Sequence, residues 1–307
     1  MALLIATPDR DATELARRVH AQDPDIDLRI WPEFGNREDI RFVLAWKPPD
    51  GLFRQLPNLE VISSLGAGVD ALIDNPEIPA HVAIGRLAGP RLAANMAAYL
   101  VAVVVSRWKR LPALVEDQRA HRWNQWAPEQ PPVIGLLGTG QMGQRTAAAF
   151  GELEFPIHGF SRSGRGPSGL TMHSGLEGLQ EIAKASDFLI NLLPLTPETR
   201  DMLDADLFAQ MREGSTLINV GRGEHLVEKD LLEALSRNRP ACAVLDVFRE
   251  EPLPKHHPFW EHPKIFITPH CASITLIGEA AELAAESYRR VLAGKPPLGK
   301  VDRTKGY

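Results

Sequence analysis

Three polar side chains in the second half of the chain could together bind an anion and move a proton. Arg222, Glu251 and His270 each follow an apolar run of the kind that forms a buried strand. An imidazolium donates a proton to an oxygen that gains negative charge, a neighbouring carboxylate favours the charged ring, and a guanidinium polarises a carbonyl. Taken singly, the three residues have ordinary explanations as an ion pair, a turn residue and a loop histidine. Taken together they fit the polarisation and protonation of a carbonyl oxygen, and we interpret them as catalytic, with Arg222 also contacting the substrate.

A glycine-rich turn in the middle of the chain predicts a site for a dinucleotide. The stretch "VIGLLGTGQMGQRTAAAF" spaces Gly138, Gly140 and Gly143 as GxGxxG between an apolar strand and a run of helix-forming residues. In such a turn the first glycine permits the sharp bend, the second lets the pyrophosphate approach the backbone, and the third packs helix against strand. The helix N-terminus adds N–H donors and partial positive charge. We assign the whole turn to cofactor binding: Gly138, Thr139, Gly140, Gln141, Met142 and Gly143.

The end of the next strand predicts which dinucleotide is bound. In NAD-binding proteins an acidic residue about 20 residues beyond the glycines accepts hydrogen bonds from the ribose 2′-hydroxyl. The stretch "HGFSRSGR" has Ser161, Arg162 and Ser163 there instead. Two hydroxyls and a guanidinium suit a 2′-phosphate, so we predict a preference for NADP(H). Use of NAD(H) stays open, because Arg162 and Arg165 also fit the solvated charges of a loop.

A second glycine pair lies in the first half of the chain. The stretch "SLGAGVD" offers consecutive backbone N–H groups, and its glycines permit the tight bend of an anion-binding nest. We interpret Leu65, Gly66, Ala67 and Gly68 as substrate-binding residues that hold a carboxylate. The alternative is an ordinary turn at the end of a strand.

Short apolar segments bounded by turn residues recur along the chain and alternate with stretches of helical periodicity. The predicted strands are residues 3–6, 42–46, 59–66, 133–138, 187–194, 216–221, 241–247 and 264–270. Such alternation is typical of parallel sheets covered by helices on both faces. We therefore predict the α/β class with two doubly wound, Rossmann-like domains.

The domain boundary falls at a long helical segment. An Ala-rich stretch at 92–115 separates two groups of strands and is followed by a polar, Trp-containing stretch at 116–132, the best candidate for a linker. A last helical segment near 277–292 follows all the strands and is expected to return to the first domain. The predicted domains are a flavodoxin-like substrate domain, residues 1–92 plus 277–307, and a dinucleotide-binding domain, residues 93–276, which includes the linker helix.

Composition excludes several classes of function. A formal charge of -5 and a pI near 6.1 leave no broad basic surface for nucleic acid. No apolar run approaches the ~20 residues of a membrane span, and the start is too short for a signal peptide, so a cytoplasmic location is expected. Cys242 and Cys271 form no CxxC pair, and we predict neither a disulfide nor a metal, only two small core residues.

The order of the motifs resembles the D-isomer-specific 2-hydroxyacid dehydrogenase family over nearly the whole chain. The matching stretches are "SLGAGVD", "LLGTGQMG", "NLLPLTPET", "INVGRGEHLVEKDLLEAL", "AVLDVFREEPLP" and "ITPH". The resemblance implies a cleft between the two domains and a homodimer in which the linker helix and the adjoining loop embrace the partner. It also implies a triad of Arg222, Glu251 and His270 and a contact of Asp246 with the nicotinamide carboxamide. The remaining cofactor contacts that we assign are Leu193, Pro194, Thr199, Val220 and Gly221.

Within this family, three stretches are similar to the glyoxylate and hydroxypyruvate reductase branch. They are "GFSRS", "NLLPLT" and "LAWKPP", which make Trp46 a candidate wall of the substrate pocket. The alternative for Trp46 is a large buried aromatic residue. One position departs from the family, because Ala98 stands where Glu often precedes the Tyr of the linker helix. We expect an altered helix contact there and no loss of activity.

These features predict an oxidoreductase that reduces glyoxylate or hydroxypyruvate with NADPH. An NAD(P)-dependent dehydrogenase of a larger D-2-hydroxy acid is the nearest alternative. A different class is a dinucleotide-dependent binding protein similar to the C-terminal-binding-protein corepressors, although no disordered interaction tail is evident. A metal-dependent hydrolase would have to use His256, His257, His262 and His270, whose spacing matches no metal motif.

Overall fold

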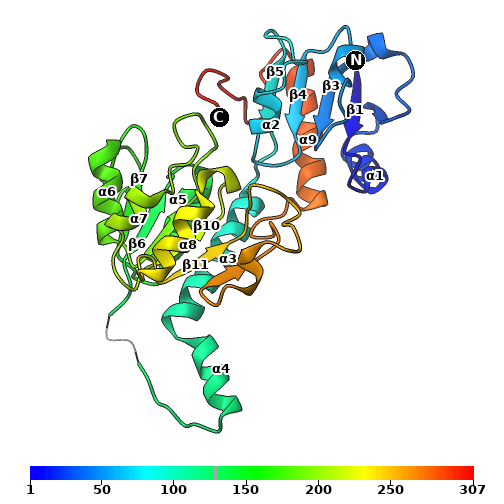
Figure 1. Cartoon of the computed structure of the whole chain (residues 1–307). Coiled ribbons are helices and arrows are strands. Elements are labelled where there is room, and N and C mark those ends of the chain that lie inside the picture. The colour runs from blue at the N-terminus through cyan, green and yellow to red at the C-terminus, as the bar shows by residue number, and fades with distance from the viewer. Residues whose placement is uncertain (128–129) are drawn as a thin grey trace. The chain divides into compact units, whose positions relative to one another are not determined.

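Two parallel β-sheets organise the chain, each in a unit of its own (Figure 1). The computed structural model describes residues 1–127 and 130–307. Met1–Leu92 and Ile274–Tyr307 together form the first unit, and Ala93–Ser273 forms the second. Parallel sheets with apolar layers on both faces confirm the predicted α/β class with two Rossmann-like domains.

The first sheet has five parallel strands in the order β2-β1-β3-β4-β5. Their bounds are Ala2–Ala6 (β1), Asp27–Ile30 (β2), Ile40–Ala45 (β3), Val61–Ser64 (β4) and Ala83–Arg86 (β5). The order reverses between β1 and β3. Open α/β sheets bind ligands beside such a reversal, at the carboxyl ends of their strands.

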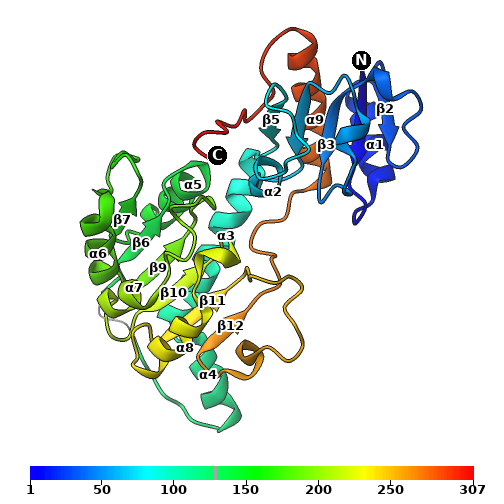
Figure 2. The same cartoon turned by 45° about the horizontal axis from the view of Figure 1, so that its top comes forward.

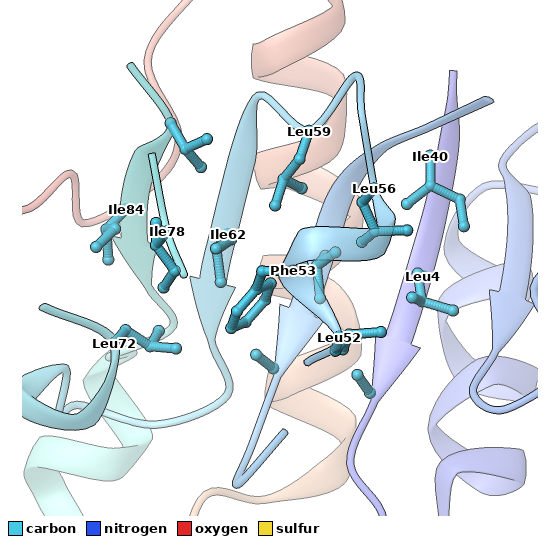
Figure 3. Close-up of a cluster of buried hydrophobic side chains, with 14 of the residues drawn as sticks. Leu4, Ile40, Leu52, Phe53, Leu56, Leu59, Ile62, Leu72, Ile78 and Ile84 are labelled. Carbon is cyan, nitrogen blue, oxygen red and sulfur yellow. The ribbon is translucent and has the colours of Figure 1, made fainter. Parts of the chain in front are cut away.

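Helices and a loop cover the two faces of this sheet. On one face α1 (Ala12–Gln22) and α9 (Ile277–Leu292) pack against β1 and β3. On the other face Phe53 and Leu56, in and beside the short helix η2 (Phe53–Gln55), meet Leu4 and Ile62 (Figure 3). Because both faces are buried, the strands read as continuous apolar runs, which is why the sequence reveals them. The remaining short helices are η1 (Arg37–Asp39) and α2 (Asp70–Ile73).

The second sheet has seven parallel strands in the order β12-β11-β10-β9-β6-β7-β8. Their bounds are Ile134–Leu137 (β6), Ile157–Phe160 (β7), Thr171–His173 (β8), Phe188–Asn191 (β9), Thr216–Asn219 (β10), Cys242–Leu245 (β11) and Ile265–Ile267 (β12). This is the dinucleotide-binding strand order with one strand added at an edge. The reversal lies between β6 and β9, so the loops after these strands are expected to meet a ligand.

Two helical layers sandwich the second sheet (Figure 2). On one face lie α3 (Pro90–Trp108) and α5 (Gln141–Gly151), with Leu100 and Phe150 fully buried. On the other face lie α6 (Gly175–Ala185), α7 (Ala205–Gln210) and α8 (Glu228–Ser236). Two short helices, η3 (Gly223–His225) and η4 (Pro258–Glu261), complete the unit.

The single helix expected at 92–115 is two helices. α3 ends at Trp108, Arg110 takes a left-handed backbone conformation with φ of 54°, and α4 spans Leu111–Arg119. Pro112 in the first turn of α4 is the sequence signal for this new start, because proline is favoured there and disfavoured inside a helix. In both views α4 projects from the sheet of its own unit (Figures 1 and 2).

Two further observations bear on the sequence predictions. Cys242 is half-buried, but Cys271 is exposed, so its prediction as a core residue is wrong. Cys271 follows the turn at the end of β12, where the chain leaves the sheet. Among the described residues, no helix combines the length and the hydropathy needed to cross a membrane.

Candidate active site

The three glycines after β6 have three different surroundings. Gly138 has a backbone φ of 104°, which residues with a side chain rarely adopt. A Cβ on Gly143 would lie 2.1 Å from the Gly138 carbonyl oxygen, so only glycine lets α5 approach the strand. A Cβ on Gly140 would meet nothing within 4 Å, which leaves open space at the N-terminus of the 11-residue helix α5. A bend, a free approach and a close packing are the features that a pyrophosphate-binding turn requires, so the residues fit a dinucleotide.

The loop after β7 is closed by its own hydroxyl groups. The Ser161 hydroxyl donates to the Arg165 carbonyl oxygen over 2.8 Å, and the Thr139 hydroxyl donates to the same oxygen over 3.2 Å. The Arg165 N–H donates to the Ser163 hydroxyl over 3.4 Å. The serines therefore shape the loop, and Thr139 ties it to the glycine turn. Arg162 is the side chain of the predicted trio that is best suited to meet a phosphate.

Arg162 is also an electrostatic neighbour of the segment after β9. Hydrogen bonds from Thr196 and from the backbone lower the pKa of Glu198, and the positive charge of Arg162 adds to this effect. Within this segment, the Thr199 hydroxyl donates to the Pro194 carbonyl oxygen over 2.8 Å. The structure thus brings two of the predicted cofactor segments close to one another.

A buried polar cluster behind this segment positions Arg222. Asn191, Asn219 and His225 are fully buried. His225 Nε2 lies 3.2 Å from the Pro194 carbonyl oxygen and must be the donor, because a carbonyl only accepts. The Nδ1 atom of the same ring therefore accepts, from the Asn191 amide over 2.8 Å and from the Arg222 N–H over 3.1 Å. The Asn219 amide donates to the Arg222 carbonyl oxygen over 2.9 Å. The sequence analysis missed these three residues, although each lies at or just after the end of a strand.

His270 and Glu251 are hydrogen-bonded to one another. Glu251 Oε2 lies 2.7 Å from His270 Nδ1, and its other oxygen accepts from the Phe248 N–H over 3.0 Å. Burial would raise the pKa of Glu251, but these hydrogen bonds and the charges of His270 and Arg222 together lower it. An ionised carboxylate only accepts, so Nδ1 carries the proton of this bond and Nε2 is left for a ligand. The three predicted catalytic residues therefore share one edge of the second sheet.

Asp246 holds the turn that carries His270. His270 has a left-handed backbone with φ of 52°, and its N–H donates to the Asp246 carbonyl oxygen over 2.8 Å. The buried Asp246 carboxylate accepts from the N–H groups of Cys271 (2.9 Å) and Ala272 (3.0 Å) and from the Thr268 hydroxyl (2.5 Å). These bonds compensate the cost of the unusual backbone conformation. The sequence analysis assigned Asp246 to the cofactor, and the structure adds this supporting contact with the turn.

Tyr99 on α3 extends the same chain of hydrogen bonds. Its hydroxyl oxygen lies 2.7 Å from that of Thr268. Thr268 has a single hydroxyl proton and gives it to Asp246, so Tyr99 must be the donor to Thr268. Burial raises the pKa of Tyr99 to about 12, which keeps its hydroxyl protonated over the neutral range. A side chain of the long helix is thus connected to the His270 turn.

In the first unit, Trp46 packs against the predicted carboxylate loop. A Cβ on Gly66 would lie 2.9 Å from Trp46 Cζ3, so glycine allows the ring to lie on the loop. The Gly66 N–H donates to the Ser64 hydroxyl over 3.3 Å, and that hydroxyl donates to the Gly68 carbonyl oxygen over 2.7 Å. The Gly66 N–H is therefore engaged by the protein, and in the part of the chain that the structure describes the N–H groups of Ala67 and Gly68 have no acceptor.

No metal centre is formed by the histidines considered in the sequence analysis. His257 pairs with Glu228 over 3.3 Å, and His270 pairs with Glu251. Within residues 1–127 and 130–307, no three His, Cys, Asp or Glu side chains are grouped as metal ligands would be.

Comparison with known proteins decides the family. The model of the D-isomer specific 2-hydroxyacid dehydrogenase, NAD binding domain, matches residues 101–272. This match covers more than half of the chain and includes the glycine turn, Arg222, Glu251 and His270. The chain belongs to the D-isomer specific 2-hydroxyacid dehydrogenase family. It is an oxidoreductase of this family, as the motifs predicted.

Relatives that align over the full length of the chain place this dehydrogenase in the glyoxylate/hydroxypyruvate reductase A branch. The protein of that name from Yersinia enterocolitica is 34% identical, and the one from Photorhabdus laumondii is 36% identical. Both alignments cover 100% of this chain and 100% of the relative. The predicted branch is confirmed.

Solved structures agree with this placement. A D-isomer specific 2-hydroxyacid dehydrogenase from Xanthobacter autotrophicus Py2, in complex with NADPH and MES, is 35% identical, with a TM-score of 0.94 over 100% of this chain and 99% of that one. An NADPH-dependent glyoxylate/hydroxypyruvate reductase from Sinorhizobium meliloti, in complex with NADP and sulfate, is 28% identical, with a TM-score of 0.92 and the same coverage. The dehydrogenase therefore has the fold of proteins that bind NADP.

Proposed function

We propose that this dehydrogenase reduces glyoxylate or hydroxypyruvate to the corresponding 2-hydroxy acid with NADPH. The observation that carries the proposal is the 2.7 Å contact between His270 and Glu251. It lies at the carboxyl edge of the sheet that bears the glycine turn, where the charge of Arg222 also reaches Glu251. A proton donor, its carboxylate and a cation are the groups that reduction of a carbonyl requires.

The residues proposed to hold the cofactor follow from the same edge. The turn from Gly138 to Gly143 and the N-terminus of α5 suit the pyrophosphate. Arg162, on the loop that Ser161 and Ser163 shape, suits the 2′-phosphate. Leu193, Pro194, Thr199, Val220, Gly221 and Asp246 are proposed to line the nicotinamide end. When bound, the nicotinamide supplies the hydride.

His270 and Glu251 are proposed to deliver the proton. Nδ1 of His270 is bonded to Glu251, so Nε2 faces the substrate and donates its proton to the carbonyl oxygen as negative charge develops there. Glu251 stabilises the imidazolium before the transfer and keeps the ring in this orientation. Arg222 polarises the carbonyl, because its guanidinium is a planar and permanent cation.

The first unit is proposed to recognise the acid group of the substrate. The N–H groups of Ala67 and Gly68 support this role for the loop Leu65–Gly68, because they have no acceptor among the described residues. Trp46 lies on the loop and is proposed to limit the size of the substrate side chain.

A homodimer is the proposed assembly, and a cytoplasmic location remains a prediction. The support for a dimer is a set of exposed apolar side chains on α4 and the following loop, namely Leu111, Leu114, Val115, Trp123 and Trp126. Exposed apolar residues gathered on one segment mark an interaction surface. Sedimentation should give the mass of a dimer, and replacing Leu114 and Val115 by Asp should give a monomer. A wild-type monomer would contradict the assembly.

The deciding experiment measures initial rates with glyoxylate and hydroxypyruvate, each with NADPH and NADH. We expect kcat/KM to be at least about tenfold higher with NADPH, since a charged hydrogen bond to a phosphate has that effect or more. Replacing Arg162 by Ala should remove most of this preference and leave the rate with NADH unchanged.

The other outcomes separate the alternatives. Equal use of NADH would keep the reductase and remove the role of Arg162. Turnover confined to larger 2-keto acids would favour a dehydrogenase of a larger D-2-hydroxy acid. Binding of NADPH without turnover of any keto acid would favour a corepressor-like binding protein.

A further inference from the structure

Two arginines lie at the carboxyl edge of the first sheet and have no part in the function described above. Arg10 follows β1, and Arg86 is the last residue of β5. Both side chains are partly buried. Within residues 1–127 and 130–307, neither forms an ion pair with a carboxylate, and Asp9, the acidic neighbour of Arg10, is paired with Lys47. A partly buried guanidinium without an acidic partner is a candidate for binding an anion.

A continuous series of contacts links the two guanidiniums. The Arg10 guanidinium carbon lies 4.0 Å from the centroid of the Trp46 ring, and that ring packs on Gly66. In the same loop, the Ala67 carbonyl oxygen accepts from Arg86 Nη1 over 3.5 Å. A guanidinium has five N–H donors, so this single bond leaves most of the donors of Arg86 for a ligand.

The electrostatic environment agrees with this geometry. Burial lowers the pKa of both guanidiniums, and only for Arg10 does an acidic neighbour, Asp9, partly oppose the effect. A cation in such a position is stabilised by an anion that enters beside it. The N–H groups of Ala67 and Gly68 have no acceptor among the described residues, and Ala67 is the residue that Arg86 contacts, so the loop favours the same kind of ligand.

We propose that Arg10 and Arg86, with Trp46 and the loop Leu65–Gly68, form a subsite for the carboxylate of the substrate. The two arginines are substrate-binding residues that supply the positive charge, while the loop supplies N–H donors. This inference rests on the proposed function for the identity of its ligand, a small 2-keto acid. It assigns to the first sheet the recognition of charge, separate from the polarisation of the carbonyl by Arg222.

The test compares variants that separate charge from shape. Arg86→Gln retains an N–H donor for the Ala67 carbonyl oxygen but loses the charge, and Arg86→Lys retains the charge. Arg10→Met keeps an apolar side chain against Trp46. The matched control is Arg37→Met, because Arg37 also lies over an aromatic ring, that of Phe34, but precedes β3 at the opposite edge of the sheet.

Two measurements are made on each variant. The first is the KM and kcat for glyoxylate with saturating NADPH. The second is calorimetric binding of oxalate, a stable dicarboxylate probe, to the protein with NADPH present. We expect Arg86→Gln and Arg10→Met each to raise KM and the Kd of oxalate about tenfold or more, since a charged hydrogen bond is lost. The kcat and the affinity for NADPH should stay within about twofold, because the groups that act on the carbonyl are intact.

The outcomes are distinct. Arg86→Lys should recover part of the affinity, and higher salt should weaken oxalate binding in the wild type more than in Arg86→Gln. If Arg86→Gln and Arg10→Met both bind oxalate as the wild type does, the subsite is wrong and Arg86 only braces the loop. If the wild type turns over no keto acid, the proposed function fails, while oxalate binding still tests the subsite. If Arg86→Gln lowers the Tm, the subsite is judged from Arg86→Lys and Arg10→Met instead.

Discussion

The polar groups at the carboxyl edges of the two sheets differ in how they are bonded. At the edge of the second sheet the polar groups are bonded to one another: His270 to Glu251, Thr268 to Asp246, and His225 to Asn191. At the edge of the first sheet, Arg10 and Arg86 have no carboxylate partner among the described residues. The difference matches the two roles proposed for these edges, because proton transfer requires a geometry fixed in advance, whereas recognition of an anion requires unneutralised charge.

The largest effect is expected from replacing the proposed proton donor at the edge of the second sheet. His270→Ala should lower kcat for glyoxylate on the order of 100-fold or more, because a positioned acid is lost, while the affinity for NADPH is kept. Steady-state rates and a fluorescence titration of NADPH measure the two quantities. His256→Ala, at an exposed histidine of a neighbouring loop, is the control and should behave as the wild type. A kcat for His270→Ala close to that of the wild type would remove the acid assignment.

Removing the carboxylate next to His270 should have a smaller effect. Glu251→Gln is expected to lower kcat for glyoxylate about tenfold, because the hydrogen bond to Nδ1 that orients the ring becomes neutral and weaker. Steady-state rates with saturating NADPH measure this change. A kcat equal to that of the wild type would mean that Glu251 does not act on the ring.

The pKa of Glu251 also predicts how the wild type responds to acid. Burial opposes the lowering of this pKa, and the hydrogen bonds from His270 and Phe248 outweigh it. A group whose pKa is lower in the folded state stabilises the fold above its unfolded pKa, and this contribution is lost as the pH falls through the folded pKa. Lowering the pH below about 4 should therefore reduce the free energy of unfolding of the wild type more than that of Glu251→Gln. Parallel curves would contradict the prediction.

A change at the first edge should act on binding alone. Gly66→Ala places a Cβ 2.9 Å from Trp46, so the ring or the loop must shift. We expect KM for glyoxylate to rise about fivefold with little change in kcat, since the groups that act on the carbonyl are untouched. Gly151→Ala is the control, because nothing lies within 4 Å of its new Cβ. A fall in kcat without a rise in KM would show that the two edges do not divide the work in this way.

The smallest effect is expected at the outer end of the hydrogen-bond chain. Tyr99→Phe removes the donor to Thr268 but leaves the bond from Thr268 to Asp246, so kcat should fall about two- to threefold. Because the pKa of Tyr99 is raised by burial to about 12, this ratio should be constant between pH 6 and 9. A ratio that varies with pH would mean that the tyrosine affects the proton transfer more directly.

Local patterns in the sequence were sufficient for the glycine turn and the three catalytic candidates. The spacing of Gly138, Gly140 and Gly143 reports one continuous turn, and Arg222, Glu251 and His270 each follow a visible strand. Short or edge strands such as β2, β5 and β8 carry too few apolar residues to be recognised.

Residues whose roles depend on contacts with distant parts of the sequence could not be predicted in the same way. Arg10 and Arg86 lie 76 positions apart, and only the parallel pairing of the strands places the carboxyl ends of β1 and β5 at one edge of the first sheet. Likewise, Asn191 and His225 form a cluster only because β9 and β10 pair in parallel and the loops after them meet. One sequence contains no record of such pairings.

The path of the chain sets an order in which the two sheets can be completed during synthesis. The second unit is one continuous segment, Ala93–Ser273, and contains all of its own core. The first sheet is buried on one face by Ala281, Ala285 and Tyr288 of α9, which leave the ribosome after every strand of both sheets. The second unit can therefore reach its native structure while this face of the first sheet is covered only by α1, so the first unit is completed only after its last helix has been made.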